Sequence, residues 1–457
     1  MALPGFRDFY PDDCAARNAI FATWRDVARR YGFVEYDGPP LEPLDLFTKK
    51  SGQEIVTQLY NFKDKGDRDV ALRPEMTPTL ARLVTARHKD FKKPLKWFSI
   101  PQVYRYERPQ KGRGREHYQF NCDIIGEVSL EADLELIALL IDTLRAFGLT
   151  EKDFVIRLSD RQFWNDFMVA HNIHEASRYE FIQAIDKSER EPRDKTSEKL
   201  NRLLEREPRE KTEERLGDIY QGHYFKDVSG EILPPIGPKL SDAVFKILDD
   251  PASTPSARLD TVEAGLRHRG LQDFVKRDYT VVRGLAYYTG VVFEVFDRSG
   301  EFRAIAGGGR YDTLLKNLGG VDLPALGFGI GDVVLGEILK GKGDFVLPRG
   351  GGIFVIIEEG TDRAKALKIV QHLRDTLSCA VNYSMTPMKF GKQLHRSIES
   401  GYNHAIIIDQ DTLLRGAFRV KNLANLETRD FKSLEELTMR NLFPSMEANP
   451  STRKTED

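Results

Sequence analysis

Apolar residues recur at helical spacing near both ends of the first 160 residues, and strand-like segments lie between. Residues 17–31 form one predicted helix that stops at Gly32, with Ile20, Phe21, Trp24, Val27 and Ala28 on one face. Residues 132–148 form another, which ends at Gly148. The strand-like segments are 60–64, 69–75, 95–109 and 118–128, and residues 154–160 return as a strand. Because no crossover helix separates each of these strands from the next, the pattern predicts an antiparallel sheet flanked by helices, an α+β fold.

Residues 161–270 differ from the region before them, because helical periodicity dominates and strand signals are few. The middle of this region, residues 189–218, is rich in charges of alternating sign. Such runs are typical of solvated helix faces, an interpretation that we favour over a direct binding role. The region therefore predicts a helical insertion, after which strand signals resume at 278–297 and 302–309 and a helix follows from about residue 311.

A segment dense in glycine and proline, residues 341–351, predicts a linker to a separate C-terminal unit. Beyond it, strand and helix alternate as in a small α/β domain. The expected organisation is a core domain over residues 1–160 and 271–340, an insertion over 161–270, an α/β domain over 352–440 and a disordered tail over 441–457.

Composition and charge exclude several classes of protein. The chain has 457 residues, and 68 Lys and Arg against 70 Asp and Glu give a net charge of −2, so any site for a polyanion must be local. No apolar run approaches the ~20 residues of a membrane span, and the N-terminus lacks a signal-peptide pattern, so we expect a cytoplasmic protein. Cys14, Cys122 and Cys379 are far apart and predict buried free thiols, with neither a disulfide framework nor a metal site.

Three clusters of charged and polar residues lie within strand-like sequence: 72–82 (LRPEMTPTLAR), 103–123 (VYRYERPQKGRGREHYQFNCD) and 281–294 (VVRGLAYYTGVVFE). In the second cluster, Arg105, Arg108, Lys111, Arg113 and Arg115 surround a glycine turn. Guanidinium groups match pairs of phosphate oxygens, so this cluster suits a polyphosphate or a nucleic-acid backbone, although charge alone equally allows a basic loop in solvent. Aromatic residues alternate with these charges, as in a half-buried hairpin, and the resulting rigidity favours a site.

These motifs resemble a known family. RYERPQKGRGREHYQFNCDIIG resembles the second motif of class II aminoacyl-tRNA synthetases in its histidyl form, and RGLAYYTGVVFE resembles the histidine-specific motif of that family. LRPEMTPTLAR is similar to its amino-acid-binding segment, AGGGRYDTLLKNLGG to its glycine-rich strand and helix, and LPALGFGIGDVVL to its third motif. Pro39 occupies the place of the proline in the dimer-forming first motif. The resemblance implies a class II catalytic domain, a C-terminal anticodon-binding domain and a homodimer formed through the first-motif region.

The resemblance also implies an activity: ATP-dependent activation of L-histidine to histidyl-adenylate, followed by transfer to the 3′ end of tRNA(His), with Mg²⁺ on the β and γ oxygens of ATP. Arg105 and Arg283 match the residues that grip the α-phosphate, and they are the expected catalytic residues. Glu107 would contact the adenine amino group, and Arg113 would meet the γ-phosphate.

Further residues match the family's substrate sites. Those expected to bind histidine are Glu75, Thr77, Gln119, Asp123, Tyr287 and Tyr288, with Asp123 and Tyr288 facing the imidazole nitrogens. Those expected to contact tRNA are Arg108, Gln110, Lys111 and Arg115 at the acceptor end, and Lys389 and Lys421 in the C-terminal domain. Without the resemblance, the favoured interpretation of Asp123 is a solvent-exposed residue at a strand end. The favoured interpretation of Tyr288 is an aromatic residue of the core.

Three positions depart from the family pattern. Asp123 stands where glutamate is usual, Ala286 replaces the usual acid, and Val334 replaces the third-motif arginine that stacks on adenine. The departures at 286 and 334 favour an alternative, a non-catalytic paralogue that acts as a regulatory subunit of ATP phosphoribosyltransferase. The two arginines, the amino-acid-binding segment and the C-terminal domain favour the ligase. A synthetase for another amino acid conflicts with RGLAYYTG.

Overall fold

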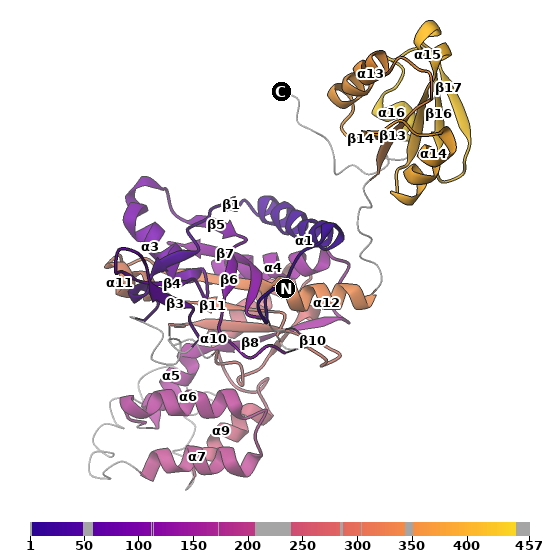
Figure 1. The fold of residues 1–457 in the computed structure, drawn as a ribbon. Helices are drawn as coiled ribbons and strands as arrows, with labels where there is room; N and C mark the ends of the chain where they lie inside the picture. Colours follow the sequence, from indigo (N-terminus) through magenta and orange to yellow (C-terminus); the bar gives the residue numbers. More distant parts are fainter. Residues whose placement is uncertain are drawn as a thin grey trace. The chain divides into compact units, whose positions relative to one another are not determined.

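The computed structural model describes residues 2–48, 58–110, 112, 114–171, 173–205, 239–283, 287–302, 304–342 and 351–444. The chain divides into two compact units, Met1–Phe345 and Val346–Asp457 (Figure 1). No helix within the described ranges is long and apolar enough to cross a membrane. Most of the linker predicted at 341–351 lies outside the described residues.

A nine-stranded sheet forms the centre of the first unit. Its order is β1 (Val34–Glu35), β5 (Leu95–Ser99), β7 (Glu116–Ile125), β12 (Ala325–Gly331), β11 (Ala306–Arg310), β10 (Val291–Asp297), β8 (Phe154–Asp160) and β9 (Val275–Arg277), and β6 (Gln102–Tyr104) also pairs with β7. Every pairing is antiparallel except the outermost two, β1 with β5 and β8 with β9. The predicted α+β class is confirmed, with parallel pairs only at the sheet's ends.

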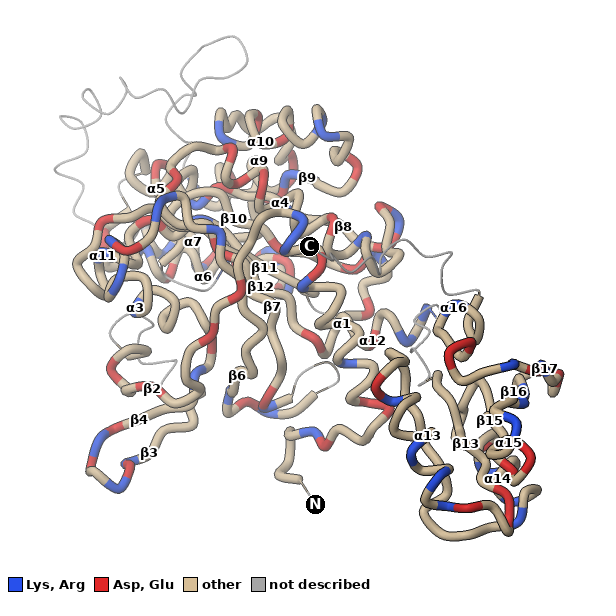
Figure 2. The backbone as a smooth tube through the Cα atoms, turned by 90° about the horizontal axis from the view of Figure 1, so that it is seen from above, with Lys and Arg blue, Asp and Glu red and all other residues tan. Residues whose placement is uncertain are grey.

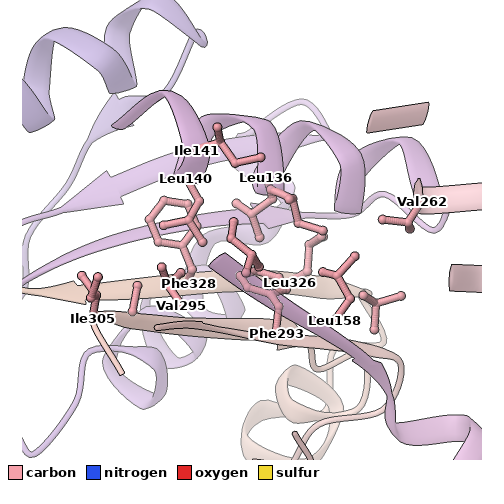
Figure 3. Close-up of a cluster of buried hydrophobic side chains, with 14 of the residues drawn as sticks. Leu136, Leu140, Ile141, Leu158, Val262, Phe293, Val295, Ile305, Leu326 and Phe328 are labelled. Carbon is pink, nitrogen blue, oxygen red and sulfur yellow. The ribbon is translucent and has the colours of Figure 1, made fainter. Parts of the chain in front are cut away.

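One face of this sheet carries the main hydrophobic core. The helices on this side are α1 (Pro11–Arg30), α4 (Leu130–Arg145), α10 (Ala257–His268) and α12 (Asp332–Lys342). Figure 3 shows side chains of α4, such as Leu136 and Leu140, against Phe293 of β10 and Phe328 of β12. α1 begins six residues before the predicted start at residue 17, since Pro11 suits a first helical turn and Asp12 and Asp13 complement the helix dipole.

The opposite face of the sheet carries a smaller layer. It contains α3 (Thr77–Arg87), the short helix η1 (His88–Asp90), α11 (Leu314–Gly319) and a three-stranded sheet of β2 (Leu41–Pro43), β4 (Asp69–Leu72) and β3 (Asn61–Lys63). Two strand predictions extend too far here. The strand predicted at 69–75 ends at Leu72, because Pro74 cannot donate to a ladder and α3 starts at Thr77. Of the strand predicted at 278–297, only Val291–Asp297 forms β10, and the described residues 278–283 and 287–290 before it belong to no strand.

The insertion is helical where it is described. Its elements are α5 (Arg161–Ala170), the short helix η2 (Glu175–Ser177), α6 (Arg178–Lys187), α7 (Arg193–Glu205) and α9 (Leu240–Asp249). α7 packs against both α6 and α9, and the three lie together in Figure 1. Residues 206–238, which include part of the charged run, lie outside the described chain. α10 packs on α4 and β8, and the short helix η4 (Gln272–Phe274) follows it; the boundary predicted at residue 270 stays a prediction.

The second unit is a five-stranded sheet with helices. Its strand order is β14 (Ala380–Tyr383), β13 (Gly352–Ile357), β15 (His404–Ile408), β16 (Phe418–Asn422) and β17 (Thr428–Phe431), and its helices are α13 (Arg363–Thr376), α14 (Phe390–Glu399), α15 (Gln410–Arg415) and α16 (Met439–Leu442). This is the α/β alternation that the sequence predicts. Leu442 and Phe443, placed by that prediction in a disordered tail, are buried in this unit's core, and residues 445–457 lie outside the described chain.

The three cysteines are free thiols, as predicted. Cys122 is buried on β7, whereas Cys14 and Cys379 are only half-buried. The prediction of burial is therefore correct for one thiol and overstated for the other two. Burial raises the pKa of the Cys122 thiol well above its usual value, so this side chain behaves as a small apolar core residue.

Candidate active site

A cavity of about 50 Å³ opens on the face of the sheet that carries α3. Every residue predicted to be catalytic or to bind histidine lines it: Glu75, Thr77, Arg105, Gln119, Asp123, Arg283, Tyr287 and Tyr288. Arg105 and Arg283 come from segments 178 positions apart in the chain (283 − 105), yet they border the same space. The structure therefore brings two guanidinium groups and two buried carboxyl groups into one small site.

Strand alternation and glycine create this cavity. Along β7, Gln119, Asn121 and Asp123 line the cavity, whereas Phe120 and Cys122 join the core on the other face, as period-two alternation requires. Gly327 of β12 pairs with Asp123, and a Cβ on this glycine would lie 1.9 Å from Asp123 Oδ1. Any larger residue at 327 would displace the Asp123 carboxyl group.

Arg283 adopts a strained backbone conformation. Its φ of 55° is in the left-handed region, which costs a residue other than glycine of the order of 1–3 kcal/mol. Its Nη1 donates to Glu294, and its Nε is buried without a hydrogen-bond partner among the described residues. Burial alone would lower the pKa of Arg283, but Tyr288 and Glu294 raise it, so the guanidinium stays charged. Strain and an unused donor together are typical of a functional residue.

Glu75 lies in the turn before α3, with 7% of its surface exposed. Its Oε2 accepts a hydrogen bond from the Tyr287 hydroxyl at 3.0 Å, whereas its Oε1 is buried with no donor in the described chain. Burial raises the pKa of Glu75 above its usual value, and Arg105, Tyr287 and Arg283 oppose that shift. A buried carboxylate oxygen that lacks a donor suits a ligand with N–H groups, such as an ammonium.

Asp123 lines the cavity and is buried, with 4% of its surface exposed. Burial raises the pKa of its carboxyl group to about 7, although the hydroxyl of Tyr311 donates to Oδ1 and acts in the opposite direction. Tyr311 and Asn121 also line the cavity, although neither was among the predicted site residues. For Asn121 the signal was available, since it lies two residues from Gln119 and Asp123 on the same strand.

Other charged residues of the three clusters have structural partners. Arg105 joins the second cluster to the first, because its Nε donates to the carbonyl of Pro74 at 3.0 Å. Arg73 donates to the carbonyls of Gly38 and Gln102, and Arg82 pairs with the buried Glu42 at 2.6 Å. These contacts hold the turn that carries Glu75 between β2 and β6.

Of the residues predicted to meet ATP or tRNA, Arg105 and Arg283 line the cavity, whereas Glu107, Arg108, Gln110 and Arg115 are not among its lining residues. In the first unit, Arg108 and Gln110 are exposed and Glu107 is half-buried. The Arg115 guanidinium lies 4.2 Å from the centre of the Tyr106 ring, and its Nε donates to the Glu107 carbonyl at 3.1 Å. In the second unit, Lys389 precedes α14 and Lys421 lies on β16. Lys111, Arg113 and Ala286 lie outside the described residues.

The position of the third-motif arginine is apolar in this chain. Val334 lies in the first turns of α12, and its Cγ2 would be 3.5 Å from a Cβ on Gly112 of the second-motif turn. Arg310 does not replace the missing cation, since it donates to Asp133 and to the carbonyls of Glu127 and Ser129.

The mostly antiparallel sheet with its flanking helices is like that of a class II aminoacyl-tRNA synthetase. The model of the family "Histidyl-tRNA synthetase" matches residues 5–331, and that of "Anticodon binding domain" matches residues 352–443. The chain belongs to the histidyl-tRNA synthetase family.

Similar proteins and structures agree with this assignment. The chain is 43% identical over 436 residues to a histidine–tRNA ligase of Opitutus terrae, covering 94% of this chain and 95% of that protein. It is 35% identical over 450 residues to one of Thermoplasma volcanium, covering 98% and 99%. The crystal structure of histidyl-tRNA synthetase from Nostoc sp. PCC 7120 has a TM-score of 0.71 at 23% identity and covers 96% of this chain and 97% of that chain, which shows the same fold.

Proposed function

We propose that this chain is a histidine–tRNA ligase that activates L-histidine with ATP and transfers the histidyl group to the 3′ end of tRNA(His). The observation that carries the proposal is the cavity in which Arg105 and Arg283 lie beside the buried carboxyl groups of Glu75 and Asp123. Membership of the family supports it. Membership of a synthetase family implies that the activity depends on ATP.

Histidine fits the polar groups of the cavity. The unpaired Oε1 of Glu75 would accept a hydrogen bond from the α-ammonium group, and Thr77 and Gln119 would orient the amino acid. Asp123 and Tyr288 would face the two imidazole nitrogens, with Tyr287 holding Glu75 in place. A pocket that leaves buried polar groups unpaired when another side chain enters can reject that side chain by ~10⁴- to 10⁵-fold.

Adenylate formation requires two anions to meet. A carboxylate oxygen of histidine attacks the α-phosphorus of ATP, and pyrophosphate leaves. Two unit charges ~4 Å apart repel each other by ~4 kcal/mol at an effective dielectric constant of ~20. Arg105 and Arg283 would offset that repulsion and stabilise the charge of the transition state from fixed positions. The 3′ hydroxyl of the tRNA then attacks the carbonyl carbon of the adenylate, and AMP leaves.

Magnesium would arrive with ATP. The described part of the chain has no group of three His, Cys, Asp or Glu side chains that could hold a metal ion. Mg²⁺ commonly binds substrate phosphates with few protein ligands, and there it would neutralise charge on the β and γ oxygens.

The remaining contacts follow from the same proposal. Glu107 would meet the adenine amino group and Arg113 the γ-phosphate, while Val334 offers adenine an apolar contact in place of a cation. Arg108, Gln110, Lys111 and Arg115 would meet the acceptor end of the tRNA, and Lys389 and Lys421 would meet its backbone from the second unit. Figure 2 shows lysines and arginines interleaved with acidic residues along both units, so tRNA contacts would be assembled from local groups.

The first-motif region would form a homodimer. Near Pro39, Val34 is 63% exposed and Leu41 is 38% exposed, and apolar side chains of this kind are suited to burial against a second copy. The proposed place of action is the cytoplasm.

Histidine-dependent exchange of pyrophosphate into ATP tests the proposed ligase. A ligase exchanges pyrophosphate only when histidine is present, and it charges tRNA(His) in a second assay. A regulatory subunit of ATP phosphoribosyltransferase, the alternative, would bind histidine without exchange. Protein that binds histidine but gives no exchange would therefore contradict the ligase.

A further inference from the structure

One residue of the insertion holds both ends of the segment that carries Arg283. Arg161 is the first residue of α5, the insertion helix that contacts β10 of the sheet (Figure 1). Its backbone N–H donates to the carbonyl of Gly290 at 2.8 Å, and its Nη1 donates to the carbonyl of Val282 at 3.0 Å. The segment from Val282 to Gly290, of which residues 284–286 are not described, is therefore fastened at both ends to the same point of the fold.

A second donor on α5 holds the chain just before this segment. Trp164 is fully buried, and its Nε1 donates to the carbonyl of Tyr279 at 3.0 Å. Arg161 and Trp164 are three residues apart and so lie on the same side of the helix. The backbone N–H of Asp278 also donates to the carbonyl of Leu158 on β8 at 2.7 Å. The approach to Arg283 is thus fixed by α5 and by the strand that leads into α5.

The surroundings of Arg161 differ from those of a structural arginine. No described carboxylate pairs with Arg161, and burial lowers its pKa to about 10. The preceding Asp160 pairs instead with Arg258 at 3.3 Å and caps α5 through the N–H of Gln162. Burying much of a guanidinium without a counter-charge is costly, so a function in holding the Val282 carbonyl accounts for the arrangement better than stability does.

The carbonyl that Arg161 holds belongs to the residue directly before a strained one. Arg283 has a φ of 55°, and such a conformation persists only where the surrounding structure fixes it. Rotation of the peptide plane between Val282 and Arg283 changes that φ and swings the Arg283 side chain. A donor that fixes the direction of the Val282 carbonyl therefore fixes where the guanidinium lies.

We propose that Arg161 is a positioning residue for Arg283, assisted by Trp164, so that the first helix of the insertion sets the geometry of adenylate formation. This inference rests on the proposed function, because it needs Arg283 to act on the α-phosphate. A displacement of the insertion at α5 would reach the catalytic centre through these two side chains.

Pyrophosphate exchange by the full-length Arg161→Met variant tests the inference. The expected result is a ~10- to 100-fold fall in kcat, because misplacement of a catalytic group by ~1 Å has effects of this size. The KM for histidine should change less than about threefold, because Glu75 and Asp123 keep their contacts, and most of the effect is specific to the transition state. Arg161→Lys should recover part of kcat, since an ammonium group can also donate to the Val282 carbonyl.

Arg269→Met is the matched control. Arg269 is another partly exposed arginine of the same region, and it pairs with Glu135 of α4 at 3.0 Å, away from residues 278–290. The Arg269→Met variant should lose some thermal stability and keep the kcat of the unsubstituted enzyme. Trp164→Phe removes one donor and keeps an aromatic ring, so it should lower kcat by a smaller factor. This variant tests the inference if Arg161→Met does not fold.

Three outcomes would overturn the inference while leaving the ligase intact. They are a kcat for Arg161→Met within twofold of the unsubstituted enzyme, an equal loss of kcat in Arg269→Met, or a rise in the KM for histidine with no fall in kcat. Absence of exchange in the unsubstituted protein would instead overturn the proposed function, and this inference with it.

Discussion

Arg310 ends strand β11 of the main sheet and Arg283 lies in the segment before β10, yet the nitrogen donors of the two arginines are used in different ways. Arg310 uses all three of its nitrogens: it pairs with the buried Asp133, donates to the carbonyls of Glu127 and Ser129, and contacts Asp312. Arg283 donates to Glu294 but keeps its buried Nε without a partner in the described chain, on a strained backbone. A satisfied guanidinium stabilises the fold, whereas an unsatisfied one at a cavity is available to a ligand.

From this comparison we expect Arg283→Ala to have the largest effect on catalysis. Removing a cation that acts in the transition state should lower kcat for pyrophosphate exchange by ~10³-fold. Histidine binding, measured by calorimetry, should stay within a few-fold. The free energy of unfolding should change little, because alanine carries the same strain at φ 55° as arginine does and the lost partner, Glu294, stays partly exposed to solvent. An equal loss of exchange and of histidine binding would show that the role of Arg283 is misassigned.

Arg310→Met should affect stability more than catalysis. The substitution leaves Asp133 buried and unpaired, and breaking a buried ion pair in this way costs ~3–5 kcal/mol. Urea unfolding measures the loss, and a second substitution, Asp133→Leu, should recover part of it because no buried charge remains. If Arg310→Met kept the stability of the unsubstituted protein but lost exchange activity, the division between the two arginines would be incorrect.

Glu75→Gln should weaken histidine binding without unfolding the protein. The hydrogen bond from Tyr287 can still form to the amide oxygen, but the charge opposite the α-ammonium group is lost. Hydrogen bonds to charged groups contribute ~1.5–3 kcal/mol, so the Kd for histidine should rise ~10- to 100-fold. The matched control is Glu42→Gln, which removes a buried carboxylate that pairs with Arg82 outside the cavity and should leave the Kd unchanged.

The smallest expected effect is a pH dependence set by Asp123. The folded-state pKa of about 7 lies above the usual value of a carboxyl group. Folding therefore favours the protonated Asp123 carboxyl group. This contribution to the free energy of unfolding is fully present below about pH 4 and is lost as the pH rises through about 7. Histidine binding should change in the opposite sense, because the ionised carboxylate that accepts from the imidazole forms as pH rises through about 7.

Asp123→Asn should remove both slopes. Tyr311→Phe should shift them to higher pH, because it deletes the hydrogen bond that favours the ionised carboxylate. Unfolding and binding measured between pH 5 and 8 give the two midpoints. Identical pH profiles for all three proteins would show that Asp123 does not titrate in this range.

The candidate site was predicted unevenly from the sequence. Motif resemblance identified residues that line the cavity, including Glu75, Arg105 and Arg283. Without the resemblance, the residue type and position of each one alone did not distinguish a functional residue from a structural one. Tyr311 was missed, because its partner Asp123 is 188 positions away and only the order β7–β12–β11 brings the two together. The contacts of Arg161 and Arg310 could not be predicted either, since their partners are carbonyls and carboxylates of distant segments.

What the sequence determined by itself is local. Apolar periodicity sets the helix that follows Ser129 and the strand at Phe154–Asp160, because each buries one face or both against a core. The tertiary structure decided where regular structure stops, at residues 73–76 and at the described residues 278–283 and 287–290, and which polar groups of the described chain remain unpaired. Those outcomes depend on contacts between strands that are far apart in the chain. A local sequence pattern carries no information about the energies of such contacts.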